Sequence, residues 1–149
     1  MNGMSVKLVL GGVAGTAAMT LMMLIAPMMG VHMDIAASLA GMVHAPWMVG
    51  MVVHLMMGIL IFPLVYGILL RRYLPGSALV RGLIWGSILW MMMEVVVMPM
   101  LGAGVFGING PGMMGAVAAL MAHLVYGGLL GVIAAGEATP ELPKLARVQ

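Results

Sequence analysis

The basic residues of this chain are confined to three short places in an otherwise apolar sequence. They are Lys7, the central group Arg71, Arg72 and Arg81, and the terminal pair Lys144 and Arg147. Four strongly apolar stretches lie between and around these places, and the other two connections carry no Lys or Arg. Because short connections that contain Lys and Arg stay in the cytoplasm, the pattern predicts four membrane-spanning helices with both termini cytoplasmic.

The composition points to lipid as the solvent. Of 149 residues, 64% are hydrophobic and 7% are charged, whereas soluble domains carry about 25% charged residues. A chain this short exposes a large part of its surface, so it cannot hide that apolar area from water. The basic residues mark a face that meets anionic lipid, and no nucleic-acid partner is expected. The absence of cysteine excludes disulfides, thiolate metal sites and iron–sulfur clusters.

A helix needs roughly 20 apolar residues to cross the hydrocarbon core. The predicted spans are about 6–29, 47–70, 79–101 and 113–135. We therefore expect an all-α, multi-pass protein of the cell inner (plasma) membrane, with a four-helix bundle over residues 1–136 and a cytoplasmic tail over 137–149. Between the first two spans, Asp34 is placed to cap a short helix that ends near Met42.

Short patterns recur in the two halves of the chain and indicate a duplicated helical hairpin. Gly11-x-x-x-Gly15 returns as Gly82-x-x-x-Gly86, and His54-Leu55-x-x-Gly58 returns as His123-Leu124-x-x-Gly127. Glycines four residues apart, such as Gly127 and Gly131, form a flat stripe that lets helices approach closely in lipid. The alternative function of such a stripe is a groove for a flat ligand.

Three of the few ionisable side chains in the predicted spans, His54, Glu94 and His123, share the outer half of the bilayer. His54 and Glu94 fall roughly 10 Å below the outer ends of their helices, and His123 falls roughly 15 Å below. Ionisable side chains within a span are costly and usually face the interior of the bundle. The equal depth of His54 and Glu94 predicts a hydrogen-bonded pair, because a carboxylate orients an imidazole in a dry site.

These three residues allow three interpretations. In the first, their hydrogen bonds only hold the helices together. In the second, His54 and His123 are the axial ligands of one b haem, and Gly58 and Gly127 make room for the macrocycle. In the third, the His and Glu side chains handle protons or a metal ion.

The 21 methionines raise the question of copper, because thioether and imidazole ligands suit Cu(I). The candidate metal ligands on the outer side are His32, Met33, Asp34 and His44. Methionine is, however, spread through every span, a distribution typical of flexible apolar filling. Copper is therefore a weaker expectation than haem.

The last span carries the run His123-Leu124-Val125-Tyr126-Gly127-Gly128-Leu129-Leu130-Gly131. This run resembles a motif of small, uncharacterised bacterial four-helix membrane proteins similar to the YagU family, which are also close to this chain in size. At His54 the likeness is weaker, because Met57 stands where the motif has tyrosine. The resemblance implies four helices in the inner membrane and no particular activity.

The sequence contains no Ser/His/Asp motif and no phosphate-binding loop, so we expect a protein that is not an enzyme by itself. We expect an accessory subunit of a membrane redox complex, bound to other membrane subunits or to copies of itself. The first alternative is a b-type cytochrome with His54 and His123 as ligands. The second is a small transporter of protons or copper.

Overall fold

The computed structural model describes residues 3–31 and 34–135, which form helices and turns without any strand. The first span is α1 (Gly3–Ile25), which ends in the 3-10 turn η1 (Ala26–Met29). The second span comprises α3 (Trp47–Met56), η2 (Met57–Ile61), α4 (Phe62–Val65) and η3 (Tyr66–Leu70). The third comprises α5 (Ala78–Met92), η4 (Met93–Val97) and α6 (Met98–Met100), and the fourth is α7 (Gly112–Ala134). The connections contain α2 (Ile35–Met42) and the 3-10 turn η5 (Val105–Gly107).

The predicted all-α membrane bundle is confirmed. Four helical segments are long and apolar enough to cross a membrane: Ser5–Met28, Trp47–Leu70, Ala78–Met100 and Gly112–Ala134. The ends of each segment agree with those of its predicted span to within one residue. The predicted tail lies outside the described residues, and the identity of the membrane and the orientation within it stay predictions.

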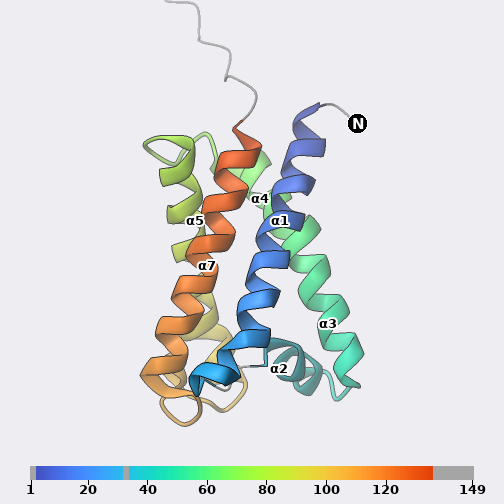
Figure 1. Ribbon diagram of the computed structural model, residues 1–149, viewed down its shortest axis with the longest axis vertical. Helices are drawn as coiled ribbons and strands as arrows, with labels where there is room; N and C mark the ends of the chain where they lie inside the picture. Colours follow the sequence, from blue (N-terminus) through green and yellow to red (C-terminus); the bar gives the residue numbers. More distant parts are fainter. Residues whose placement is uncertain (1–2, 32–33, 136–149) are drawn as a thin grey trace, which may run out of the picture.

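The four spans lie in the order α5, α7, α1 and then the second span (Figure 1). The start of α1, the 71–77 turn and the end of α7 lie at one end of the bundle, which we call the basic end because Lys7, Arg71 and Arg81 are near it. At the other end, which we call the cavity end, α2 packs beside α3. Asp34 caps α2 as predicted, and its carboxylate accepts from Ala37 N at 2.9 Å.

Glycines set the spacing around α7. A Cβ on Gly82 would clash with the carbonyl of Gly127, and one on Gly86 would clash with the carbonyl of His123. On the other side of α7, Gly15 of α1 lies directly against the ring of Tyr126. The backbones therefore approach more closely than any side chain would permit, which is how helices gain contact in lipid.

Gly11 and Gly131 extend the same stripes. Gly11 packs on Leu130, and Gly131 packs on Gly82 and the Ala78 carbonyl. All five predicted packing glycines therefore face a neighbouring helix.

The second and third spans are interrupted by π-helical turns, and two of them, η2 and η4, each precede a proline. Proline lacks an N–H and its ring clashes with the carbonyl four residues back. For Pro63 that carbonyl belongs to Ile59, inside η2 (Met57–Ile61), and Pro99 stands in the same relation to η4 (Met93–Val97). The wider π turn accommodates the proline ring, so the helix continues past each of these prolines.

Aromatic rings close the bundle on the basic-end side. The indole of Trp85 meets the ring of Phe62 edge-on at a centroid distance of 6.3 Å and stacks on Tyr66 at 6.4 Å. These contacts join the third span to the second. Tyr126 and Leu130 of α7 complete the same buried cluster. Towards the cavity end, α3 packs instead on α2, with Gly50 lying against the carbonyl of Ala36.

Candidate ligand cavity within the membrane

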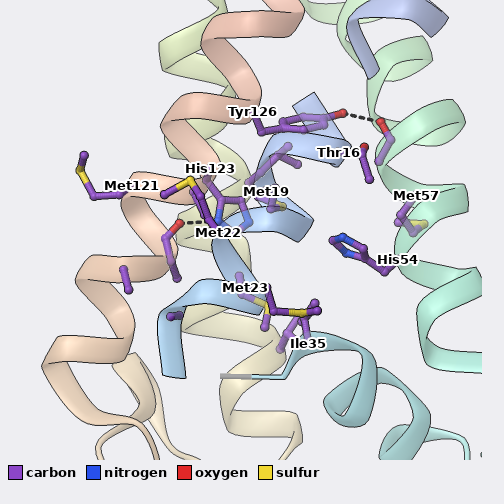
Figure 2. Close-up of a pocket in the computed structure, with 18 of the residues that line it drawn as sticks. Thr16, Met19, Met22, Met23, Ile35, His54, Met57, Met121, His123 and Tyr126 are labelled. Carbon is purple, nitrogen blue, oxygen red and sulfur yellow. Dashed lines mark hydrogen bonds between the residues drawn. The ribbon is translucent and has the colours of Figure 1, made fainter. Parts of the chain in front are cut away.

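A cavity of ≈ 460 Å³ lies between the spans on the cavity-end side of the aromatic cluster (Figure 2). All four spans contribute to its walls, which are almost wholly apolar. Seven methionines line it: Met19, Met22, Met23, Met57, Met92, Met93 and Met121. Its polar side chains are those of Thr16, His54, His123 and Tyr126. Its volume lies in the range of small-molecule sites, about 300–1,000 Å³.

His54 stands in the last turn of α3, just before the π turn, and is buried. Its Nε2 lies 3.1 Å from the hydroxyl oxygen of Thr20 on α1. The bond ties α3 to α1 beside the cavity. A threonine hydroxyl can both donate and accept, so either tautomer of the imidazole satisfies this contact.

His123 approaches from α7, and its Nδ1 lies 2.7 Å from the carbonyl oxygen of Ala119. A carbonyl only accepts, so Nδ1 must carry the proton. In the neutral imidazole, Nε2 is then an acceptor with a free lone pair. Figure 2 shows the His54 and His123 rings on opposite sides of the same cavity. Both residues were predicted from the sequence as candidate ligands. The fold places them on the same cavity, although they are 69 positions apart in the chain.

Thr16 is the polar residue whose importance the sequence did not reveal. Its side chain is 1% exposed, lines the cavity, and its Oγ1 has no hydrogen-bond partner among the described residues. A Cβ on Gly58 would clash with that oxygen, so Gly58 provides the space that the hydroxyl occupies. A buried hydroxyl without a partner is costly. The signal available in the sequence was only that threonine is rare in these spans.

Tyr126 forms the floor of the cavity and donates its hydroxyl to the carbonyl of Gly58 at 2.8 Å. This bond follows from the π turn. There the N–H of Phe62 bonds to the carbonyl of Met57, five residues back. In the same register the carbonyl of Gly58 would need an N–H from residue 63, which is proline and has none. Tyr126, from the other hairpin, satisfies that carbonyl.

Glu94 requires a correction. It is buried within η4, as expected for an ionisable residue in a span, but it does not line the cavity. Nor does any hydrogen bond or ion pair between Glu94 and His54 occur in the described part of the chain. Equal depth did not bring the two together, because depth fixes the height of a residue along its helix and not the direction that it faces.

Gly127 also differs from its predicted role. It packs against Gly82 and Gly86 of α5 and does not line the cavity, so it is not the residue that makes room for a ligand beside His123. The equivalent glycine of the first hairpin, Gly58, does line the cavity.

Of the predicted outer metal ligands, the two that the structure describes, Asp34 and His44, belong to no group of side chains that could hold a metal ion. Asp34 caps α2 and accepts from the indole N–H of Trp47 at 2.9 Å, while His44 is exposed. His32 and Met33 lie outside the described residues. Within residues 3–31 and 34–135, no group of three or more His, Asp or Glu side chains could hold a metal ion.

The residues that line the cavity suit the axial positions of a b haem but not its propionates. Two imidazoles face it, and the Nδ1 bond of His123 is the arrangement that orients a ligating histidine. The two propionates of haem are anionic, however, and the cavity walls contain no Lys or Arg. The Lys and Arg residues of the described chain are at the basic end, beyond the aromatic cluster. The residues present therefore suit the axial positions and leave the propionates without a cation.

Fold and cavity together define a multi-pass membrane protein with a ligand-sized apolar cavity between its spans. A family model described as "Family of unknown function (DUF6789)" matches residues 3–141, so the chain belongs to that family. No curated protein and no solved structure matches it. The resemblance to the YagU family stays a prediction.

Proposed function

We propose that the protein is a small accessory subunit of a membrane redox complex and holds an apolar redox cofactor or carrier between its spans. One observation carries the proposal: His54 and His123, from different hairpins, face the same apolar cavity. Imidazoles buried in a membrane are costly and are typical of functional sites. Here neither is used to bind the other or to pair with Glu94.

Within the described residues, the small part outside the spans supports the role of a subunit. Outside the spans, the described residues form α2, η5 and short connections. Catalytic machinery that exchanges electrons with a soluble substrate would then belong to a partner. In this proposal the protein lies in the inner membrane with its basic end in the cytoplasm, in accordance with the positions of Lys and Arg.

The test is isolation of the tagged full chain from its own membranes in a mild detergent, followed by native electrophoresis and mass spectrometry. We expect it to migrate with subunits that carry haem, flavin or metal centres, and to show a redox-dependent absorption spectrum. Isolation as a homo-oligomer with no redox-active partner, under conditions that keep other respiratory complexes intact, would overturn the proposal.

A b-type cytochrome is a second candidate, because the two imidazoles share a cavity. Haem would supply one-electron transfer, and His54 and His123 would be its ligands. The test is the reduced-minus-oxidised spectrum of the purified chain and of His54→Ala and His123→Ala. Haem at about one per chain that is lost in both variants is the expected result. A haem band that survives both substitutions, or a colourless protein, would contradict it.

We do not propose the transporter function. It needs a polar path past His54, Glu94 and His123, and Glu94 does not line the cavity.

A further inference from the structure

The ring pair that joins the second and third spans also brings two arginines to the same level of the bundle. Tyr66 stacks on Trp85, with ring centroids 6.4 Å apart. Arg71 follows Tyr66 by one π turn, and its N–H bonds to the Tyr66 carbonyl at 2.7 Å. Arg81 precedes Trp85 by one turn of α5. Each span therefore carries an arginine one turn beyond the rings, towards the basic end. Both guanidinium groups lie within electrostatic range of the Tyr66 phenol.

The packing holds these two guanidinium groups in place. Arg71 and Arg81 are partly buried, whereas the neighbouring Arg72 is exposed and lies over the ring of Tyr73 at 4.8 Å. Nη1 of Arg71 donates to the carbonyl of Ala134 at 3.0 Å. Of the guanidinium nitrogens of Arg81, only Nε is buried without a hydrogen-bond partner in the described part of the chain. A ligand would therefore meet the outer N–H groups of Arg81.

No acidic side chain of the described residues is near Arg81. The described acids are Asp34, which caps α2 at the cavity end, and Glu94, which lies 13 residues or about 20 Å further along the third span. Arg81 also stands next to the first turn of α5, where the helix dipole adds positive potential and favours a negative charge. With Arg71 at the same level, this region favours an anion.

The depth of the two arginines indicates which anion can reach them. Arg81 lies three residues after the first residue of its span, about 5 Å from the end, and Arg71 directly follows the last residue of the second span. This is the level where the hydrocarbon core meets the head groups. Guanidinium groups bind phosphate through two parallel N–H bonds, and basic pockets between spans bind lipid head groups. The phosphate of a membrane lipid fits both the chemistry and the depth.

The surroundings of the arginines favour a lipid over a soluble phosphate. Large apolar side chains next to them in the chain are exposed: Leu69 at 54%, Leu79 at 47% and Val80 at 42%. Acyl chains attached to the phosphate can cover these side chains, whereas an inorganic phosphate ion would leave them uncovered. Covering them adds the burial of apolar surface to the charge interaction.

We propose that Arg71 and Arg81 form a site for one anionic phospholipid at the basic end of the bundle. The outer N–H groups of Arg81 bind the phosphate, Arg71 adds a second positive charge, and the acyl chains lie along the second and third spans. A lipid whose head group carries its own cation binds more weakly, because that cation is repelled by the arginines. The site lies at the opposite end from the cavity and does not depend on a redox role.

The test uses the full chain, purified in a mild detergent and stripped of endogenous lipid, and native mass spectrometry. Dioleoylphosphatidylglycerol is the probe. Dioleoylphosphatidylcholine, which has the same phosphate and acyl chains with an added cation, and inorganic phosphate are measured in parallel. We expect one phosphatidylglycerol per chain, with an affinity about fivefold above that of phosphatidylcholine, the scale of one arginine acting on anionic lipid. An excess of inorganic phosphate should not displace it.

Three variants assign the binding to the site. Arg81→Gln removes the charged donor and should weaken phosphatidylglycerol binding about tenfold. Arg81→Lys should restore only part of the affinity, because lysine keeps the charge and loses the planar fork. Arg72→Gln is the matched control, because it removes the same charge from a neighbouring exposed position, and it should leave the affinity unchanged. Circular dichroism and size-exclusion chromatography verify that each variant is folded.

Several results would overturn the inference. Equal losses in Arg81→Gln and Arg72→Gln would show that only the net charge of the basic end matters. Unchanged binding in Arg81→Gln, or equal binding of the two lipids, would show that no such site exists. Displacement of the lipid by inorganic phosphate would assign the arginines to a soluble phosphate instead. None of these results bears on the redox-subunit proposal, whose test is the partner that is isolated with the chain.

Discussion

The two halves of the bundle are built from similar apolar residues but are packed in different ways. Towards the basic end, the rings of Tyr66 and Trp85 are buried and stacked, and the second and third spans touch. Towards the cavity end, the same two spans are separated by the cavity and its methionines. Aromatic rings are rigid and fill a fixed volume, whereas the flexible side chains of methionine can adapt to different contents of the cavity. From this difference we expect the packing at the basic end to contribute more to the stability of the fold than the packing around the cavity.

The boundary between the halves is set by Pro63, the π turn and Tyr126. The hydroxyl of Tyr126 reaches the carbonyl that Pro63 leaves without a donor, and its ring lies on Gly15. The floor of the cavity is therefore held by contacts from three spans, so changes on either side of it should have separate effects.

The largest expected effect is on stability at the basic end. Trp85→Ala removes the ring between the second and third spans and should lower the free energy of unfolding by about 3–5 kcal/mol. Met57→Ala, at the wall of the cavity, should cost about 1 kcal/mol or less, because one side of Met57 already lacks packing partners. Reversible unfolding in mixed micelles measures both. Equal losses would remove the distinction between the halves.

Close backbone contact between α5 and α7 should be nearly as sensitive. Gly82→Ala places a methyl group against the Gly127 carbonyl and should cost about 1–3 kcal/mol through forced separation of the helices. Gly41→Ala on α2 is the matched control, because a Cβ there meets nothing within 4 Å. That control should be neutral or slightly stabilising, and a comparable loss in both variants would show that backbone contact is not the cause.

The role of Tyr126 can be examined with a double-mutant cycle. Tyr126→Phe leaves the buried carbonyl of Gly58 without a donor and should cost about 1–3 kcal/mol. In a Pro63→Ala background residue 63 regains its N–H, so the same substitution should cost less. The coupling free energy from the four unfolding curves is the measurement. Additive effects would mean that the proline does not create the need for the tyrosine.

The smallest effect is expected at α2. Asp34→Ala removes the helix cap and the bond to Trp47, and should destabilise this short helix by about 1 kcal/mol. Amide hydrogen exchange should accelerate within Ile35–Met42 while exchange in α7 stays unchanged. Faster exchange throughout the bundle would show that α2 supports the whole fold rather than only the cavity end.

The sequence alone established the elements of this protein. Apolar stretches of sufficient length defined the four spans, the glycine spacing indicated their packing faces, and Asp34 marked the start of α2. These are local properties, because hydrophobic length, helical spacing and capping depend on residues near one another in the chain.

Only the tertiary structure decided how the polar residues are combined. It placed His54 and His123 on one cavity, separated Glu94 from His54, and left the hydroxyl of Thr16 unpartnered beside Gly58. Sequence gives a buried residue its depth along the helix, but its neighbours depend on how each helix is rotated and on its π turns. A single π turn rotates every later side chain of a span, so the partners across the bundle are fixed only when the spans pack together.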